Sequence, residues 1–294
     1  MPEETVRFFM KNRCKWVARI VLVVLGFHLE SMAYENVVWE GVTYDDRTVA
    51  ELITVITTTS PLQSIPTTKH LYYAQKSLAQ IPALALCKKI IAFDDIQPTS
   101  NFAYRKRDYD LYKKHIKELT ETDPYFANTE LIFLTEWGCL VGALKEAFKR
   151  VKTPFVFIQQ HDLLLLKTFD LNALIATMVA NPAVRYVTLL PGTNGAGYLP
   201  YWKHLDDNIK GVHFVPLCRA GGWTDQCHVA RADYYRNFVF PRCPGNYMES
   251  HILHQYWDEI ERNGFEKAHD LFGIYLYGSL EDGFFITHTN GKYH

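Results

Sequence analysis

From Glu51 onward the sequence alternates short apolar runs with segments of helical periodicity, and this alternation most limits what the chain can fold into. The apolar runs that predict strands lie at 52–57, 89–93, 130–134, 154–158 and 184–190. The segments that predict helices lie between them, at 67–79, 109–119, 140–150 and 170–179. Strands that alternate with helices usually pair in parallel and carry the helices on both faces of the sheet. The sequence therefore predicts an α/β fold with a mostly parallel sheet.

The domain organisation follows from where the alternation begins. The chain has 294 residues, 48% of them hydrophobic, which is enough for one domain with a substantial core. No internal repeat or low-complexity linker interrupts residues 51–294, so we expect one catalytic domain there and an N-terminal extension at 1–50. The last third is less regular, with an apolar run at 212–217 and helices expected at 231–238 and 249–263.

The N-terminal extension has two interpretations. Basic residues at positions 7, 11, 13, 15 and 19 precede an apolar run at 20–27, and Ser31-Met32-Ala33 follows with small residues. This order resembles a signal peptide or a short signal anchor. The run is shorter than the roughly 20 residues of a membrane span, so a buried strand or helix is the alternative. Membrane association through this segment is one expectation, and the location stays open between the secretory pathway and the cytoplasm.

Charge, cysteine and glycine patterns exclude several classes of site. The formal net charge is −1, and no basic patch outside the N-terminus indicates a nucleic-acid partner. The six cysteines include no C-x-x-C pair of a zinc site, and free thiols are expected, although Cys218, Cys227 and Cys243 are close enough in sequence for a bridge. The glycine-rich segment 191–197 lacks the Lys-Ser/Thr ending of a phosphate-binding Walker loop.

Polar residues follow three of the predicted strands directly. They are the segment 57–61 (three threonines, a serine and a proline), the pair Asp94 and Asp95, and the triplet Gln160-His161-Asp162. Each segment alone is explained by capping or turn formation. Because ligands of open α/β sheets bind outside the carboxyl ends of the strands, the three together predict one crevice.

The same segments resemble those of GT-A glycosyltransferases found in large DNA viruses, algae and bacteria. The similarity covers about residues 51–294 and is carried by the segments 53–61, 64–68, 93–95, 151–162, 222–231, 234–235 and 248–249. It implies a Rossmann-like GT-A fold, whose less regular C-terminal part binds the acceptor. It also implies a nucleotide-sugar donor and a role in glycan biosynthesis.

The resemblance implies a metal site at Asp162. This family commonly holds manganese or magnesium with an Asp-x-Asp motif, and a divalent cation neutralises charge on the departing diphosphate. Gln160 stands where the first Asp is usual, which leaves one carboxylate and puts strong metal binding in doubt. His161 suits manganese better than magnesium. His288, with Lys292 nearby, is the expected second contributor from a C-terminal loop, and the alternative for His288 is a surface histidine.

The remaining roles are implied in the same way. Thr59, Ser60 and Pro61, with Asp94 and Asp95, match positions that hold the nucleoside, and Gln160, His161 and Asp162 lie at the donor phosphates. The basic triplet at 105–107 either contacts phosphate or is a solvated face.

Inversion at the sugar carbon needs a general base beside the acceptor hydroxyl. Glu249 lies where the catalytic acid of the family falls, and Asp225 is its competitor. The alternative for Glu249 is an acid favoured by the helix dipole in a first turn. Trp223 is expected to stack on an acceptor sugar, with His228 beside it.

These expectations lead to one main hypothesis and two alternatives. The main one is a glycosyltransferase that moves a sugar from a nucleoside-diphosphate donor to a glycan or glycoprotein acceptor, with inversion. The loss of the first Asp at Gln160 favours an inactive sugar-nucleotide or glycan-binding module of the same fold. A metal-dependent hydrolase built on His161, Asp162, His228 and His288 is disfavoured, because these histidines lack a spacing such as H-E-x-x-H.

Overall fold

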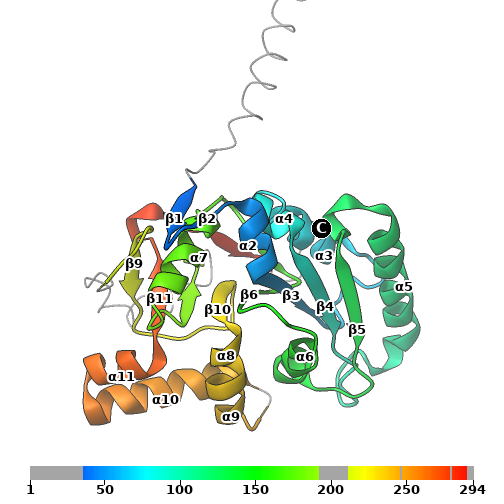
Figure 1. Cartoon of the computed structure of the whole chain (residues 1–294). Helices are drawn as coiled ribbons and strands as arrows, with labels where there is room; N and C mark the ends of the chain where they lie inside the picture. Colours follow the sequence, from blue (N-terminus) through cyan, green and yellow to red (C-terminus); the bar gives the residue numbers. More distant parts are fainter. Residues whose placement is uncertain (1–35, 192–210, 246, 279, 290–294) are drawn as a thin grey trace, which may run out of the picture. The chain divides into compact units, whose positions relative to one another are not determined.

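The computed structural model describes residues 36–191, 211–245, 247–278 and 280–289, which belong to one compact unit that begins at Asn36 (Figure 1). The N-terminal segment 1–35, most of the glycine-rich segment 191–197, and Lys292 lie outside the described residues. Within the described part, no helix has the length and apolar character that a membrane crossing requires.

The compact unit begins earlier than residue 51. Strands β1 (Val37–Trp39) and β2 (Val42–Tyr44) form a hairpin whose turn, Glu40-Gly41, has φ angles of 48° and 79°. Asp45 then caps helix α2 (Asp46–Leu52) by accepting a hydrogen bond from the Thr48 amide at 2.8 Å. Both β1 and α2 pack against a later helix, α7 (Leu171–Ala180). The expected extension at 1–50 is therefore wrong in its boundary, because residues 36–50 are part of the folded unit.

An eight-stranded mixed sheet forms the centre of the unit. Its order is β5-β4-β3-β6-β10-β8-β11-β9, and all strands run parallel except β10 and β9. The strands are β3 (Ile53–Thr59), β4 (Lys88–Phe93), β5 (Thr129–Phe133), β6 (Phe155–Gln160), β8 (Tyr186–Thr188), β9 (Leu217–Arg219), β10 (His228–Arg231) and β11 (Ile274–Tyr277). The predicted α/β class, a mostly parallel, Rossmann-like sheet flanked by helices, is confirmed.

The helices surround this sheet (Figure 1). They are α3 (Lys69–Leu78), α4 (Pro82–Leu86), α5 (Lys106–Thr122), α6 (Cys139–Phe148), α7, α10 (Met248–Asn263) and α11 (Phe265–Phe272), with 3₁₀ turns at 103–105, 124–126 and 280–282. The helix expected at 231–238 is corrected: Arg231 ends strand β10. A short α-helix (Ala232–Tyr234), a π-helical turn (Tyr235–Val239) and α9 (Phe240–Arg242) follow.

A second, two-stranded sheet brings the C-terminal region beside the end of β6. Strand β7 (Leu163–Leu165) pairs antiparallel with β12 (Ile286–His288), so that His288 lies opposite Leu163. The Thr289 amide donates to the Asp162 carbonyl at 2.9 Å and continues the pairing. His288 is thereby fixed next to the residues that follow β6.

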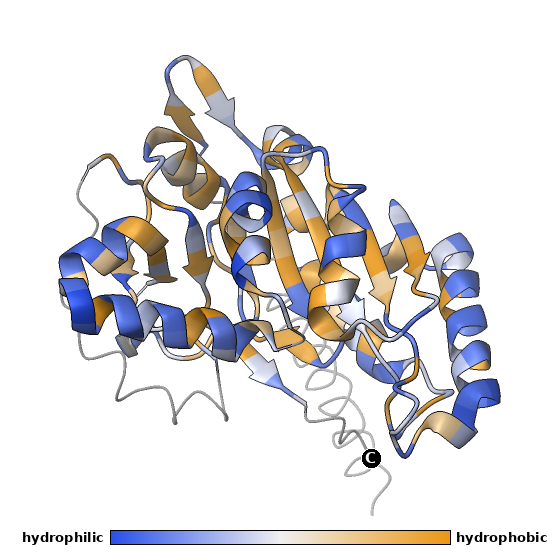
Figure 2. Cartoon of the chain, turned by 90° about the horizontal axis from the view of Figure 1, so that it is seen from below, coloured by the Kyte–Doolittle hydropathy of each residue, from blue (hydrophilic) through white to orange (hydrophobic). Residues whose placement is uncertain are grey.

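The burial of β3 agrees with its position in the middle of the parallel strands. All seven residues of β3 are buried, as expected for a strand with helices over both faces. The buried Thr57 hydroxyl of β3 accepts from the Gln75 and Gln159 side-chain amides at 2.8 and 3.1 Å. Figure 2 shows apolar residues concentrated on the strands and hydrophilic residues on the outer sides of the surrounding helices.

Gly273 joins helix α11 to strand β11 in a conformation that suits glycine. Its φ and ψ are 64° and 42°, and its carbonyl accepts from the amides of Arg185 and Tyr186 at the start of β8. A Cβ at this position would lie 2.5 Å from the Ala183 carbonyl oxygen. The left-handed turn therefore sets the close approach of α11 and β8.

We expect Gly273→Ala to lower the free energy of unfolding by about 2–4 kcal/mol, through left-handed strain and overpacking together. Gly283→Ala is the matched control, because Gly283 has a similar φ of 69° and open space around its Cβ position. Urea unfolding would measure both. Equal losses in the two variants would show that the contact with Ala183 contributes nothing.

Candidate functional site

A cleft of about 340 Å³ opens at the carboxyl ends of β3, β4 and β6. It is lined by Thr58, Thr59, Ser60, Asp94, Gln97, Trp137, Cys139, Leu140, Ala143, Gln160, His161 and Tyr247. Five expected donor-site residues are thus brought together: Thr59, Ser60, Asp94, Gln160 and His161. Pro61, Asp95 and Asp162 adjoin them in sequence but are not among the described residues that line the cleft.

Asp94 fixes the position of one wall of the cleft through hydrogen bonds. Its buried carboxylate accepts hydrogen bonds from the backbone amides of Gly138 at 2.8 Å and Asp95 at 2.9 Å. Burial raises the pKa of Asp94, and these amide bonds oppose the rise. Because Gly138 immediately precedes α6, Asp94 holds the start of this helix against the end of β4. Asp94 therefore shapes the wall as well as facing the cleft.

Two carboxylates lie together behind Gln160. The Gln160 side-chain amide donates to Asp225 Oδ1 at 3.3 Å. Burial, together with the nearby negative charge of Glu249, raises the pKa of Asp225 to about 7. Glu249 lies in the first turn of α10, and its Oε1 is buried without a hydrogen-bond partner. The structure thus brings both candidate bases close to Gln160, which lines the cleft.

His161 and Asp162 leave buried polar atoms without partners beside the cleft. Both ring nitrogens of His161 and the Oδ1 of Asp162 are buried and accept or donate no hydrogen bond. Burial lowers the pKa of His161, so its imidazole is neutral near pH 7. Native proteins satisfy nearly all buried polar groups, so each exception calls for a physical reason, such as strain, a catalytic role, or a water or ion that completes the bonding. This end of β6 therefore has unused hydrogen-bonding and metal-binding capacity.

His288 faces Asp162 across the small sheet. Its Nε2 lies 3.3 Å from Asp162 Oδ2, and the two side chains are 26% and 13% exposed. Thr289 Oγ1 donates to the Asp162 carbonyl at 3.2 Å and also contacts His70 Nδ1 at 3.3 Å, which ties this region to α3. Asp162 and His288 are therefore placed as a pair of potential metal ligands, with one free carboxylate oxygen. In the described parts of the chain, no three His, Cys, Asp or Glu side chains converge as a metal site.

Trp223 and His228 are in the core and do not face the cleft. Their side chains are 1% and 0% exposed, and both rings pack against Tyr186. The expected stacking of Trp223 on an acceptor sugar, with His228 beside it, is therefore wrong in this structure. A buried indole can stack only on its protein neighbours. The same burial removes His228 from the hydrolase hypothesis.

The first residue of the basic triplet at 105–107 makes hydrogen bonds that stabilise the fold. Arg105 donates to Asp108 at 2.9 Å and to the carbonyls of Gln63 and Ile65, while Lys106 pairs with Asp110 at 3.9 Å. The five cysteines of the described residues are free thiols.

Sequence reasoning missed several residues of the cleft wall. Trp137, Cys139 and Tyr247 line it, and Tyr247 is 68% exposed. Trp137 and Cys139 precede and begin α6 rather than following an apolar run, so a search after strands passes over them. Tyr247 stands two residues before Glu249, and this proximity to the predicted base was the available signal.

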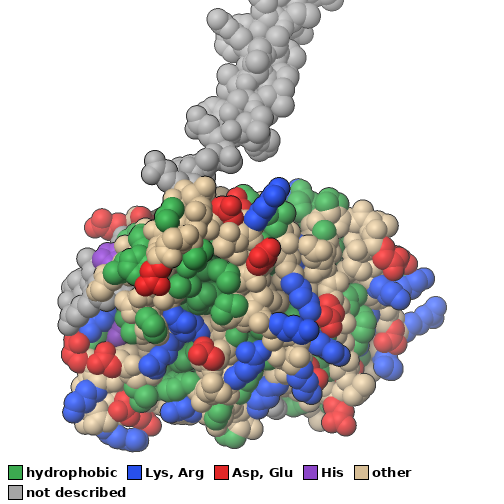
Figure 3. Space-filling view, viewed as in Figure 1, with side chains coloured by type: hydrophobic (Ala, Val, Ile, Leu, Met, Phe, Trp, Pro, Cys, Tyr) green, Lys and Arg blue, Asp and Glu red, His purple; other side chains and the backbone are tan. Residues whose placement is uncertain are grey.

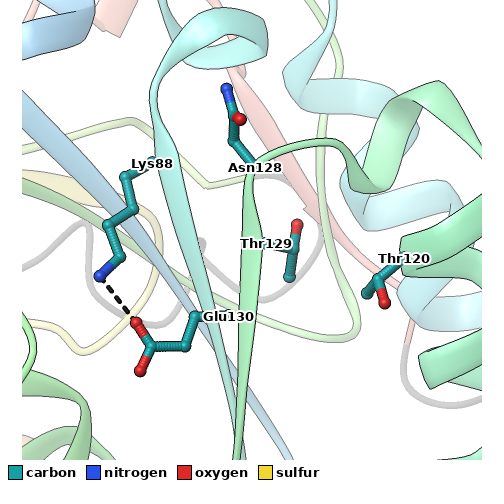
Figure 4. A pocket seen from close by; sticks show the side chains of 5 residues that line it. All are labelled: Lys88, Thr120, Asn128, Thr129 and Glu130. Carbon is teal, nitrogen blue, oxygen red and sulfur yellow. Dashed lines mark ion pairs between the residues drawn. The ribbon is translucent and has the colours of Figure 1, made fainter.

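A second hollow, of about 490 Å³, lies at the opposite ends of β4 and β5 (Figure 4). Its main polar contact is the ion pair between Lys88 Nζ and Glu130 Oε2 at 2.7 Å, and both side chains are well exposed. Exposed pairs of this kind contribute little energy. Ligands of parallel sheets bind at the carboxyl ends, so this hollow is not the candidate site. On the face shown in Figure 3, Lys and Arg side chains are interspersed with Asp and Glu.

Comparisons with known proteins were made at the level of sequence and of structure. No protein-family model and no curated protein sequence matches the chain. Among solved structures, the chain is similar to a mannosyltransferase from Pyrobaculum calidifontis in complex with GDP-Man and Mn²⁺, at 13% identity and a TM-score of 0.43. That similarity covers 63% of this chain and 46% of the mannosyltransferase, so the chain spans about half of its length.

Two further structures cover more of the chain. The glucosyl-3-phosphoglycerate synthase from Mycobacterium tuberculosis, in complex with Mn²⁺, UDP and glucosyl-3-phosphoglycerate, is 11% identical, with a TM-score of 0.42 and coverages of 83% and 75%. A cytidylyltransferase from Leptospira borgpetersenii is 10% identical, with a TM-score of 0.43 and coverages of 78% and 76%. These values do not bear on activity. The fold class is established by the sheet itself.

We expect Asp225 to make the stability of the protein depend on pH. The folded carboxyl keeps its proton up to about pH 7, whereas its ordinary pKa is 3.8. Between these values the folded chain binds a proton that the unfolded chain has lost, so stability falls as pH rises through this window. Asp225→Asn should therefore gain at least about 3 °C in Tm relative to the wild type between pH 4 and pH 8.

Thermal unfolding across this pH range would measure the effect. Asp258→Asn, at an exposed position on α10, controls for the general loss of one acid. A constant Tm difference between wild type and Asp225→Asn at all pH values would contradict the raised pKa.

Proposed function

We propose that the chain is a glycosyltransferase that transfers a sugar from a nucleoside-diphosphate donor to a glycan or glycoprotein acceptor, with inversion. The proposal rests on one observation: two clusters of buried polar atoms that lack hydrogen-bond partners lie at the same edge of the sheet. Unpartnered atoms of His161 and Asp162 lie at the end of β6, and the unpartnered Glu249 Oε1 lies beside Asp225, which Gln160 connects to the cleft.

The first group suits the donor. Asp94, Thr59 and Ser60 line the cleft with a carboxylate and two hydroxyls, which can bond ribose hydroxyls and the base. His161, neutral and unpartnered, offers an N–H to a phosphate oxygen. The donor would thus lie along the carboxyl ends of β3, β4 and β6, with its diphosphate toward Asp162.

A divalent cation fits this arrangement with two protein ligands. Asp162 supplies a buried free carboxylate oxygen, and His288 supplies an imidazole nitrogen 3.3 Å from the same carboxylate. This pairing of oxygen with imidazole nitrogen suits Mn²⁺ better than Mg²⁺. When bound, the cation supplies positive charge against the departing diphosphate. Because Gln160 replaces the first Asp, Asp162 and His288 are the two protein side chains that would hold the cation.

The second group suits the acceptor. Glu249 would accept the proton of the attacking hydroxyl through the carboxylate of its partly exposed side chain, and Asp225 is the neighbouring carboxyl that accepts a hydrogen bond from Gln160. At pH below about 7 Asp225 keeps its proton, so its carboxyl cannot take up the proton of the acceptor hydroxyl. Tyr247, exposed on the rim of the cleft, takes the sugar-stacking role expected of Trp223.

Donor binding and turnover test this function directly. A panel of UDP-, GDP- and CMP-sugars should include one that raises the Tm of the full chain in the presence of Mn²⁺, since a ligand of the native state stabilises it. The same donor should be hydrolysed, and transferred to oligosaccharides, faster with Mn²⁺ than with a chelator. Glycan or donor binding without turnover under either condition would instead identify a binding module of this fold.

We expect Glu249→Gln to lower kcat for transfer by about 100-fold or more, because an amide accepts no proton and general-base catalysis contributes this much. The KM for the donor should change little, since Glu249 does not line the donor cleft. Glu261→Gln, in the last turn of the same helix, is the control. Transfer by Glu249→Gln at the wild-type rate would exclude Glu249 as the base.

Asp162→Asn and His288→Gln should each weaken Mn²⁺ binding by about tenfold or more in the presence of UDP or GDP, because each removes one ligand. Electron paramagnetic resonance of free Mn²⁺ measures this without any turnover. His254→Gln, which changes an exposed histidine of α10, should bind Mn²⁺ like the wild type. Unchanged affinity in both ligand variants would place the metal elsewhere.

A further inference from the structure

The turn that carries Asp225 lies on a buried stack of three rings. The Tyr186 and His228 rings are stacked with centroids 4.3 Å apart, and Tyr235 follows at 5.8 Å from His228 with an interplanar angle of 8°. All three side chains are fully buried. Phe148 and Phe240 enclose Tyr235 from other sides. The stack is therefore held firmly between the sheet and the helices that follow β10.

Hydrogen bonds fix the protonation of His228 within this stack. Its Nδ1 contacts the Gln226 carbonyl oxygen, which can only accept, so Nδ1 carries the proton. Its Nε2 then accepts from the Tyr235 hydroxyl at 2.7 Å. Burial lowers the pKa of His228 to about 3, and the ring stays neutral. The Tyr235 hydroxyl thus donates to His228, and His228 in turn donates to Gln226, the residue after Asp225.

The residue before Asp225 is held from the same stack. The Tyr186 hydroxyl donates to the Thr224 carbonyl, and the Gln226 amide donates to Thr224 Oγ1 at 3.3 Å. The carbonyls on both sides of Asp225 therefore accept hydrogen bonds from buried rings. With its backbone fixed at two points and its Oδ1 bonded to Gln160, the Asp225 carboxyl has little freedom to move.

If three apolar rings filled the same space instead, no buried polar atom there would need a hydrogen bond. A buried polar network is costly unless every member is bonded, and a fully bonded network gives rigidity in return. We propose that Tyr186, His228 and Tyr235 form a positioning clamp that fixes the Asp225 carboxyl between Gln160 and Glu249. These three are positioning residues, since none touches the cleft, and their effect on catalysis rests on the function proposed above.

The clamp predicts that removing single hydroxyl or ring nitrogen atoms alters a site that those atoms do not touch. Tyr186→Phe removes the bond to Thr224 and keeps the ring. His228→Leu removes the bond to Gln226, and His228→Asn restores an amide donor near the position of Nδ1. Tyr234→Phe is the matched control, because Tyr234 is buried in the same segment and its hydroxyl has no hydrogen-bond partner.

Two measurements decide the proposal. The first is steady-state transfer, where Tyr186→Phe and His228→Leu should lower kcat about tenfold with donor KM within about twofold, because small misplacements of a catalytic group are costly. The second is a carbon-13 titration of the Asp225 carboxyl, which needs no activity. There the same variants should move the Asp225 pKa toward its ordinary value, while His228→Asn and Tyr234→Phe leave it as in the wild type.

The titration requires the neighbours of Asp225 to be taken into account. The titratable groups that face it are Glu249 on α10, Asp162 after β6, Cys139 on α6, Tyr186 on β8 and Tyr235 after β10. Repeating the titration in a Glu249→Gln background removes the carboxylate that raises the pKa of Asp225 most, and the shift caused by Tyr186→Phe should persist there.

Tyr186→Phe and His228→Leu proteins that unfold cooperatively, with wild-type kcat and wild-type Asp225 titration, would overturn the clamp. If His228→Leu does not fold, Tyr186→Phe and His228→Asn decide the question alone. A wild-type chain that transfers no sugar would refute the proposed function, and the titration would still test the clamp.

Discussion

The parallel pairing of β3 with β4 on one side and β6 on the other is the constraint on which the rest of the structure depends. Its register places Thr59 beside Phe93, and Thr58 beside Gln160, so the three strands end at nearly the same level. Whatever follows them must meet at one edge of the sheet. Asp94, Ser60 and His161 come together for this reason alone, although they are far apart in the sequence.

Buried polar atoms without a hydrogen-bond partner occur both at the cleft and away from it. The Thr57 hydroxyl accepts from two side-chain amides, whereas the side-chain oxygens of those two glutamines, Gln75 and Gln159, have no partner. Both ring nitrogens of His161, at the carboxyl edge, also have none. Hydrogen bonds that a fold leaves unmade in its interior cost free energy, and a bound ligand recovers it. An unpartnered buried atom therefore points to binding only where its residue also lines the cleft, as His161 does.

The sequence predicts the parallel half of this fold because its strands are long, apolar and separated by clear helical periodicity. The strands β3, β4, β5 and β6 and their helices lie within a few residues of the expected ranges. The antiparallel strand β10 was missed because it has only four residues and includes a histidine and an arginine. Strands β7, β11 and β12 are equally short, and their pairing is decided by tertiary contacts that a local pattern does not contain.

The site residues also divide into those that the sequence predicts and those that it does not. Residues directly after strands are predictable, and His288 was placed near Asp162 only through the resemblance to a family. The role of Trp223 was misjudged because the sequence around it, an aromatic residue next to two glycines, is the same whether the ring faces solvent or the core. In the structure the Tyr186 ring packs against the Trp223 ring. Burial is a property of the whole fold, so composition around a residue does not reveal it.

The small sheet of β7 and β12 has a consequence for how the site comes into being. Thr289 is bonded to Asp162, 127 positions earlier in the chain, and the amides of Phe285 and Ile286 are bonded to the Leu190 carbonyl, so long-range pairing holds His288 in its place. Closing loops of this length costs entropy, which these bonds help to offset. A ligand that contacts both Asp162 and His288 would draw the end of the chain into register, so occupancy of the site and completion of the fold are one linked equilibrium.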